Sequence, residues 1–273
     1  MASTSSPSAR PLGIFDSGIG GLTVASAIHE LMPQETIVYF GDTAHLPYGD
    51  KSPEAIRKWS AAIVDFLMEY DCKAIIIACN SISSVAFDAV KKQVGKHAEV
   101  INVIDPVVEY VSVQPGVKNV GVIGTKATIK TDVYASKLHQ LSKKINVCSL
   151  ATPLLAPMIE EGFFNNKISK TIIHDYLGRP KLKNIDSLIL GCTHYPLIKP
   201  EIDQYYKSKV NIVDSARVVA QHVRTLLEER RLLHSGKVRK HRFFVSDFTK
   251  SFEQSTKLFF RGKVRLEKKN LWA

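Results

Sequence analysis

The sequence predicts an α/β protein with two pseudo-symmetric domains, each built around a parallel sheet. Apolar runs alternate along the chain with amphipathic segments of helical period, which is the pattern of βαβ units. The 273 residues, 45% of them hydrophobic, are enough to bury two cores. Residues 13–17 also resemble residues 121–125, and each of these segments precedes a cysteine by more than 60 positions. The two halves of the chain are therefore expected to share one topology.

Continuous aliphatic runs bounded by polar residues predict strands that are buried on both faces. They lie at residues 12–15, 36–40, 74–78, 100–104, 119–123, 145–150, 187–190 and 210–213. Apolar side chains that recur at the helical period predict the intervening helices, one of which has Pro53 at its start. These helices are expected at residues 22–31, 53–70, 83–94, 131–141, 171–177 and 216–231.

The pattern changes after the last of these helices. Residues 242–246 and 259–264 are predicted to form short strands that extend one edge of a sheet. No low-complexity linker separates the two halves, so the domains are expected to exchange segments. The first domain is assigned residues 1–99 together with 210–273, and the second domain is assigned residues 100–209.

The cellular location of the protein is predicted from the absence of a signal-peptide pattern and of a membrane-span pattern. The N-terminal ten residues have no apolar core, and no segment approaches the roughly 18 apolar residues of a membrane span. A cytoplasmic protein without membrane contact is expected. Its four cysteines should be free thiols there, and their spacing contains no C-x-x-C pair that would indicate zinc or a dithiol redox centre. No metal is expected.

The net charge of +11 is concentrated at the C-terminus. Residues 230–273 hold 13 Lys and Arg against 3 Asp and Glu, which leaves about +1 for the remainder. The segment is interpreted as a solvated basic face, because charge of one sign is common on surfaces. The alternative is a nucleic-acid-binding protein, which predicts salt-sensitive binding that disappears when the segment is neutralised. Nucleic acid is not the expected partner.

Two cysteines carry the strongest functional signal. Cys79 and Cys192 each follow a predicted buried strand by one or two residues, and small hydrogen-bonding side chains come next. The carboxyl ends of such strands are where open α/β sheets bind ligands, so the active site is expected in the cleft between the domains. If one thiol removes a proton from a carbon while the other donates to its opposite face, the product is the mirror image. The pair therefore predicts racemisation or epimerisation, while Cys72 and Cys148 are interpreted as small hydrophobic residues.

Each thiol needs a partner, because its ordinary pKa of about 8.5 leaves only a few per cent ionised at neutral pH. For Cys192 the nearby His194 is available, and Glu160 is a carboxylate that could orient the imidazole. A single cysteine with a histidine would indicate an acyl transferase or a protease. That interpretation leaves the second thiol without a role.

The partner of Cys79 is either Asp16 or Asp42. Asp16 opens a glycine-rich segment, 16–21, whose amides could bind an anion, although its spacing is not that of a dinucleotide or phosphate loop. Asp42 opens a long loop, 42–49, at the end of the second predicted strand. A carboxylate can accept the thiol proton, but its charge opposes thiolate formation. A helping role for Asp16 therefore requires a compensating cation or a substrate ammonium.

With these residues in view, the chain resembles the glutamate racemases, within the aspartate/glutamate racemase superfamily. The resemblance runs from about residue 12 to residue 231. Its motifs are residues 13–22, 42–49, 78–80, 160–162 and 191–197. The family usually has a threonine where this chain has Ser81, which keeps the hydroxyl and loses a methyl group. At the neighbouring pair of acidic residues, Glu160 is preferred to Glu161 as the assisting carboxylate.

The resemblance implies cofactor-independent interconversion of L- and D-glutamate, with D-glutamate supplied for peptidoglycan synthesis. It implies that Cys79 deprotonates D-glutamate and Cys192 deprotonates L-glutamate. The groups implied to assist them are Asp16, Asp42, Glu160 and His194. The residues implied to contact substrate are Asp16, Ser17, Pro47, Tyr48, Gly49, Asn80, Ser81, Thr125, Thr128, Thr193 and His194. A homodimer is compatible with the sequence, which does not define the oligomeric state.

Two further alternatives stay open from the sequence. A racemase for aspartate or another small amino acid would share the thiol pair. A thiol redox enzyme would instead form a disulfide between Cys79 and Cys192, which a substrate-sized separation of the sulfurs would exclude.

Overall fold

The computed structural model describes residues 6–248, 250–262 and 264–272. The strands are β1 Leu12–Asp16, β2 Ile37–Gly41, β3 Ala74–Ile77, β4 Glu99–Asn102, β5 Asn119–Gly124, β6 Asn146–Ala151, β7 Ser187–Gly191, β8 Asn211–Val213, β9 Arg242–Val245 and β10 Leu266–Lys268. The helices are α1 Leu22–Leu31, α2 Pro53–Met68, α3 Asn80–Val94, α4 Asp105–Ser112, α5 Lys126–Lys130, α6 Val133–Leu141, α7 Leu155–Glu160, α8 Lys167–Leu177, α9 Lys199–Tyr206, α10 Ser215–Glu229 and α11 Lys250–Phe259. All eight strands predicted before residue 231 are confirmed within two residues at either end.

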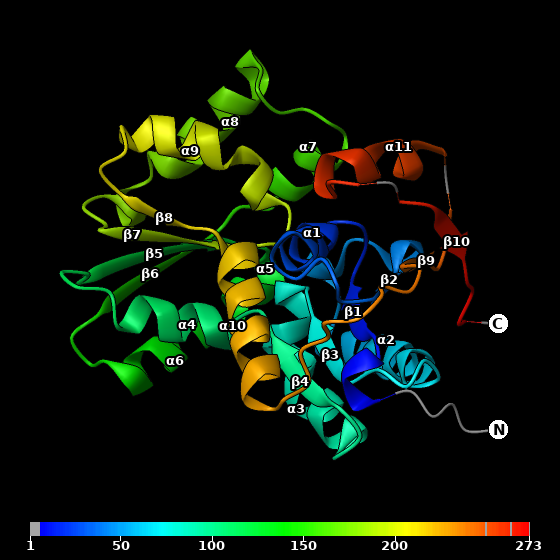
Figure 1. Cartoon of the computed structure of the whole chain (residues 1–273). Helices are drawn as coiled ribbons and strands as arrows, with labels where there is room; N and C mark the ends of the chain where they lie inside the picture. Colours follow the sequence, from blue (N-terminus) through cyan, green and yellow to red (C-terminus); the bar gives the residue numbers. More distant parts are fainter. Residues whose placement is uncertain (1–5, 249, 263, 273) are drawn as a thin grey trace.

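The strands form two sheets in which every pair is parallel (Figure 1). The first sheet has the order β10-β9-β2-β1-β3-β4, and the second has the order β6-β5-β7-β8. The run β2-β1-β3-β4 corresponds strand by strand to β6-β5-β7-β8. The prediction of two similar α/β domains is confirmed. Strand β3, which precedes Cys79, corresponds to β7, which precedes Cys192.

Burial on both faces explains why the central strands are aliphatic. Every residue of β1, β3 and β7 is buried. In β3, Ile75 and Ile77 belong to the apolar cluster that includes residues of α2 and α3, whereas Ile76 belongs to the cluster that includes α1. Alternate side chains of one strand thus anchor helices on opposite faces of the sheet.

Local signals in the sequence begin the helices α2 and α10. Helix α2 follows Ser52, whose side chain accepts a hydrogen bond from the amide of Ala55, and Pro53 occupies its first turn. Helix α10 follows Asp214, which accepts from the amide of Ala216. Helix α10 then packs against α1 of the first domain and against α4, which lies in the chain between β4 of the first sheet and β5 of the second (Figure 1).

The prediction for the C-terminal segment is correct at one strand and wrong at the other. Strand β9 lies at the predicted 242–246 and pairs with β2. The predicted strand at 259–264 is instead the end of α11 and the turn after it, and the last strand is β10. Two consecutive buried aromatic residues, Phe259 and Phe260, resemble a strand in sequence, but here they close a helix over the apolar core. Lys263, within that prediction, lies outside the described residues.

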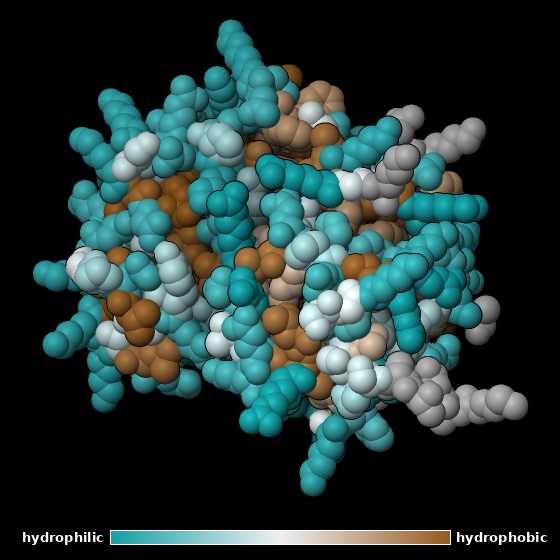
Figure 2. All heavy atoms as spheres, in the orientation of Figure 1, coloured by the Kyte–Doolittle hydropathy of each residue, from teal (hydrophilic) through white to brown (hydrophobic). Residues whose placement is uncertain are grey.

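The predicted domain limits remain a prediction. Strand pairing places β4, at 99–102, in the first sheet and β8, at 211–213, in the second, although residues 100–102 were assigned to the second domain and residues 211–213 to the first. Figure 2 shows a face on which hydrophilic side chains predominate and apolar side chains form separate patches. Among the described residues, no helix is both long enough and apolar enough to cross a bilayer.

Candidate active site

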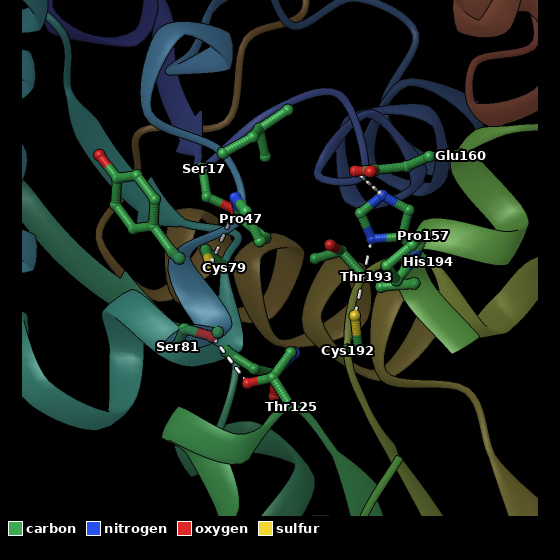
Figure 3. Close-up of a pocket in the computed structure, with 15 residues that line it drawn as sticks. Ser17, Pro47, Cys79, Ser81, Thr125, Pro157, Glu160, Cys192, Thr193 and His194 are labelled. Carbon is green, nitrogen blue, oxygen red and sulfur yellow. Dashed lines mark hydrogen bonds and ion pairs between the residues drawn. The ribbon is translucent and has the colours of Figure 1, made fainter. Parts of the chain in front are cut away.

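A small cavity of about 40 Å³ lies where the carboxyl ends of the two sheets face each other, and Figure 3 shows its lining. Its size leaves room for about three ordered waters. The lining residues come from both domains. They are Ser17, Leu46, Pro47, Tyr48, Gly49, Cys79, Asn80, Ser81, Thr125, Ala156, Pro157, Glu160, Cys192, Thr193 and His194.

Both candidate thiols line this cavity and are buried, each with only 6% of its surface exposed. Cys79 lies two residues after the end of β3 and directly before the first residue of α3, and Cys192 directly follows β7. Figure 3 shows Cys79 beside Ser17 on one side and Cys192 near His194 on the other. All four cysteines are free, so the disulfide that a redox enzyme would need is not formed between this pair. Cys72 is fully buried, as expected of a small hydrophobic residue.

Cys79 has an environment that keeps its thiol neutral. Burial, together with the nearby charge of Asp16, raises the pKa of Cys79 to about 12. The sulfur lies 3.5 Å from the hydroxyl oxygen of Ser17, to which the thiol donates. In the absence of substrate, this sulfur is therefore a proton donor.

Cys192 has a different set of neighbours. Its Sγ lies 3.6 Å from Nδ1 of His194, and Nε2 of the same ring lies 2.8 Å from Oε1 of Glu160 (Figure 3). Burial disfavours the charged imidazolium, but the interactions with Cys192 and Glu160 outweigh it and raise the pKa of His194 well above its ordinary value. Glu160 lies against the imidazole, whereas Glu161 is exposed. This geometry favours Glu160 as the assisting carboxylate.

Asp16 lies behind the cavity wall and does not line it. Its carboxylate is fully buried, and its Oδ2 accepts hydrogen bonds from the amides of Gly18 and Gly21 at 3.1 and 3.0 Å. Burial raises the pKa of Asp16, and the positive charge of His194 partly offsets that shift. Two amides of the glycine-rich segment thus bind the carboxylate of their own segment. They stabilise the buried carboxylate, while the compensating positive charge comes from His194.

Gly20 of this segment also allows the two domains to approach each other. A Cβ atom at Gly20 would lie 2.6 Å from Nδ1 of His194 and 2.6 Å from Oγ1 of Thr193. Thr23 donates from its hydroxyl to the carbonyl of Thr193 at 2.8 Å. The turn before α1 is therefore packed directly against the residues that follow Cys192.

Asp42 is also buried behind the cavity. Its Oδ2 accepts from the hydroxyl of Tyr48 at 2.6 Å and lies 2.8 Å from Nδ1 of His45. Through Tyr48 it contacts the part of the loop that lines the cavity, Leu46 to Gly49. Asp42 is therefore placed to hold this loop, and the structure does not bring it to the cavity surface.

Hydrogen bonds between the domains complete the site. The hydroxyl oxygens of Ser81 and Thr125 lie 2.9 Å apart. The hydroxyl oxygen of Thr128 lies 3.1 Å from that of Thr125, on the side away from the cavity, which Thr128 does not line. The hydroxyl of Tyr134 donates to Oδ1 of Asn80 at 2.7 Å. Tyr134 carries no functional signal in the sequence, because a tyrosine inside a predicted helix is indistinguishable from a core residue.

Comparisons with known proteins agree with this geometry. A family model described as "Asp/Glu/Hydantoin racemase" matches residues 22–223. A glutamate racemase of Chlorobium phaeobacteroides is 43% identical over 255 residues, covering 93% of either chain. The crystal structure of glutamate racemase from Francisella tularensis in complex with D-glutamate has a TM-score of 0.91 and 39% identity, covering 97% of this chain and 99% of that one. A glutamate racemase isoform from Bacillus anthracis has a TM-score of 0.90 and 33% identity, covering 96% and 97%.

The matched region contains both cavity thiols, and the solved structures share the arrangement of the two parallel-sheet domains over nearly the whole chain. These matches cover well over half of the chain at identities above 30%. The chain therefore belongs to the Asp/Glu/hydantoin racemase family and is an amino-acid racemase.

Proposed function

We propose that the protein is a glutamate racemase that interconverts L- and D-glutamate with two thiol acid/bases and no cofactor. One observation carries the proposal: the buried thiols of Cys79 and Cys192 line one cavity from the ends of corresponding strands. A racemase must remove a proton from one face of a carbon and return a proton to the other face. The names of the relatives, and the D-glutamate in the F. tularensis complex, support glutamate as the substrate.

In the L-to-D direction, Cys192 acts as a thiolate and takes the α-proton of L-glutamate. The electron pair left on the α-carbon is delocalised into the substrate carboxylate, and Cys79 donates its thiol proton to the opposite face. The products are D-glutamate, a Cys79 thiolate and a Cys192 thiol. In the D-to-L direction the two sulfurs exchange roles, so one proton remains on the pair after either conversion.

The charges around the two sulfurs support this starting state. The imidazolium of His194, held by Glu160, attracts negative charge on the neighbouring Cys192. Burial and the charge of Asp16 favour the protonated form of Cys79. We therefore assign the thiol proton to Cys79 when L-glutamate arrives, and the role of base in this direction to Cys192.

The negative charge that develops on the substrate carboxylate needs hydrogen-bond donors. In a buried site such donors are worth more than in water, because they are already oriented. We assign this role to cavity residues with hydroxyl, amide or imidazole groups, and substrate contact to the loop that shapes the cavity wall. They are Ser17, Asn80, Ser81, Thr125, Thr193 and His194, with Pro47, Tyr48 and Gly49. Asp42 acts on Tyr48 and Thr128 acts on Thr125 from behind the wall. Asp16 acts from there through its charge on Cys79 and its attraction to His194.

The proposal is tested by incubating the protein with D-glutamate in D₂O without added cofactor. Optical rotation and exchange of the α-proton are followed together. Cys79→Ser and Cys192→Ser should each abolish racemisation, and Cys148→Ser, at a half-buried thiol on β6, serves as the matched control. Racemisation of aspartate but not glutamate would overturn the assignment of glutamate as the substrate. Full activity in either catalytic variant would overturn the two-thiol mechanism.

We further propose that the product supplies D-glutamate for peptidoglycan. Expression of the chain should restore growth of a bacterial strain that requires D-glutamate, and the Cys79→Ser variant should not. Restoration by that variant would contradict the assignment.

A further inference from the structure

The C-terminal segment that follows α10 reaches the loop that shapes the cavity. Strand β9 pairs with β2, and the register places Val245 beside Gly41 (Figure 1). The amide of Ser246 then donates to the carbonyl of Gly41 at 3.0 Å. Ser246 therefore lies next to Asp42, the first residue of the loop, although the two residues are 204 positions apart.

The side chain of Ser246 makes two hydrogen bonds to this loop. Its hydroxyl donates to Oδ1 of Asp42 at 2.6 Å and accepts from the amide of Ala44 at 2.9 Å. Ser246 is 2% exposed and Asp42 is fully buried. A buried carboxylate is stable only when its oxygens are hydrogen-bonded, so Ser246 supplies a partner that water cannot replace.

The second oxygen of Asp42 transmits this contact to the cavity. It accepts from the hydroxyl of Tyr48 at 2.6 Å, and Tyr48 lines the cavity while being 1% exposed. The chain of contacts is therefore Ser246, Asp42, Tyr48 and the cavity. Rotation of the Asp42 carboxylate would release Tyr48 and the loop backbone on either side of it.

A parallel set of contacts holds the same loop one residue further on. The hydroxyl of Thr43 donates to the carbonyl of Asp247 and accepts from its amide. The carboxylate of Asp247 is held in turn by Lys268 of β10 at 2.6 Å. The basic C-terminal segment is thus attached to the loop at two consecutive residues. Charge alone does not describe its role.

We propose that Ser246 is a positioning residue for the racemisation site. It orients the carboxylate of Asp42, which holds Tyr48 and the wall formed by residues 46–49 in the conformation that binds substrate. This inference rests on the proposed function and assigns to the C-terminal segment a part in substrate binding.

The test compares three variants of the full chain. Ser246→Ala removes both hydrogen bonds, and Ser246→Thr keeps the hydroxyl. Ser187→Ala is the matched control, because Ser187 is another buried serine whose hydroxyl donates a hydrogen bond, in this case to the backbone carbonyl of Asn211. Ser187 lies at the start of β7, away from the cavity. Ser246→Ala should raise KM for glutamate about tenfold with a smaller change in kcat, because it leaves a buried charge partly unpaired.

Threonine should restore most of the lost affinity, and Ser187→Ala should leave KM unchanged. In the double variant with Tyr48→Phe, Ser246→Ala should add little to the increase in KM, because both residues act through Asp42. Unchanged KM in Ser246→Ala, failure of threonine to restore it, or additive effects in the double variant would overturn the proposal.

A measurement without turnover separates this inference from the proposed function. The chain has two tryptophans, and Trp59 stacks on His45 and contacts Tyr48. In a Trp272→Phe background, acrylamide quenching of Trp59 reports the packing of the loop. Ser246→Ala should increase the quenching, and Ser246→Thr and Ser187→Ala should not.

The outcomes can be told apart. If the parent protein does not racemise glutamate while Ser246→Ala still increases the quenching, the proposed function fails and the positioning of the loop stands. If the parent protein is active and the quenching is unchanged in Ser246→Ala, the positioning role fails. Increased quenching with an unchanged KM also overturns it, since the loop would then move without affecting substrate binding.

Discussion

The carboxylate of Glu160 lies 2.8 Å from Nε2 of His194 and orients the imidazole that contacts Cys192 through its other nitrogen. Glu160→Gln keeps the size of the side chain and removes its charge. We expect kcat/KM to fall about 100-fold, the range typical of losing a positioned proton-transfer partner. The loss must be equal in both directions, because the enantiomers have equal free energies in water.

The exposed neighbour Glu161 supplies the matched control for this variant. Glu161→Gln makes the same chemical change one residue away and should leave kcat/KM within about twofold of the parent. Polarimetry from both enantiomers measures both variants. A larger loss in Glu161→Gln than in Glu160→Gln would reverse the assignment.

The pH dependence of activity follows from the same pair. Interactions with Cys192 and Glu160 overcome the effect of burial and raise the pKa of His194, so its imidazolium persists at pH values above the ordinary range of histidine. The part of the activity that requires the imidazolium of His194 is present below this raised pKa. It is lost as the pH rises through that pKa. In Glu160→Gln the alkaline limb of the kcat/KM profile should therefore move to lower pH. Profiles with superimposable limbs would contradict this explanation.

Gly20 should tolerate no side chain. A Cβ atom there would lie 2.6 Å from both His194 Nδ1 and Thr193 Oγ1, so Gly20→Ala must displace the residues that follow Cys192. We expect a loss of about 1–3 kcal/mol in the free energy of unfolding, as for other overpacked sites, together with a large loss of kcat. Urea unfolding and polarimetry measure the two effects.

The control for Gly20 is Gly236→Ala, because Gly236 is exposed and the side chain nearest to it, that of His234, can move aside. This variant should keep both stability and activity. Parent-like activity in Gly20→Ala would show that the contact between the two domains is not needed for the reaction.

The eight strands before residue 231 were predictable because their signals are local. A strand buried on both faces must be aliphatic, and its end is where polar residues begin, so both Cys79 and Cys192 could be placed at strand ends from sequence. Side-chain pairs between distant elements carry no such signal. The bonds from Tyr134 to Asn80 and from Ser246 to Asp42 join residues 54 and 204 positions apart. Only the packing of the two domains and of β9 brings them together.

The same limit explains which features of the candidate site the sequence did not predict. Asp16 and Asp42 were predicted as alternative partners of Cys79, but the sequence did not indicate that both lie behind the cavity wall, where backbone amides and hydroxyl groups bind them. The residue type indicates a functional carboxylate, but how deeply that carboxylate is buried depends on the other segments of the chain that pack around it. The paired aromatic residues 259–260 misled the prediction for a related reason, since burial alone does not distinguish the end of a helix from a strand.

Tyr134→Phe should weaken substrate binding without unfolding the protein. The hydroxyl of Tyr134 holds Oδ1 of Asn80, and Nδ2 of Asn80 has no partner among the described residues. Loss of one hydrogen bond of about 1 kcal/mol should raise KM about fivefold. Tyr206→Phe is the control, because the hydroxyl of Tyr206 is buried without a partner within the described part of the chain. Equal KM values in the two variants would contradict a role for Tyr134.

Stability away from the site should depend on a buried ion pair at the opposite end of the first sheet. Lys73 Nζ lies 2.6 Å from Oε2 of Glu35, and each side chain is 1% exposed. Lys73 also donates to the carbonyl oxygens of Ser8 and Leu232, and Glu35 accepts from the amide of His234. The pair therefore fastens both the N-terminal segment and the connection between α10 and β9 to the sheet.

Lys73→Met should lower the free energy of unfolding by about 3–5 kcal/mol, because it leaves the Glu35 carboxylate buried without its counter-charge. Adding Glu35→Gln should recover part of this loss, since the uncompensated charge is then removed. KM for glutamate should stay unchanged in the folded protein, because Lys73 precedes β3 whereas Cys79 follows its other end. Urea unfolding at neutral pH measures the losses. A loss below about 1 kcal/mol in Lys73→Met would mean that water reaches the pair and that it behaves as a surface ion pair.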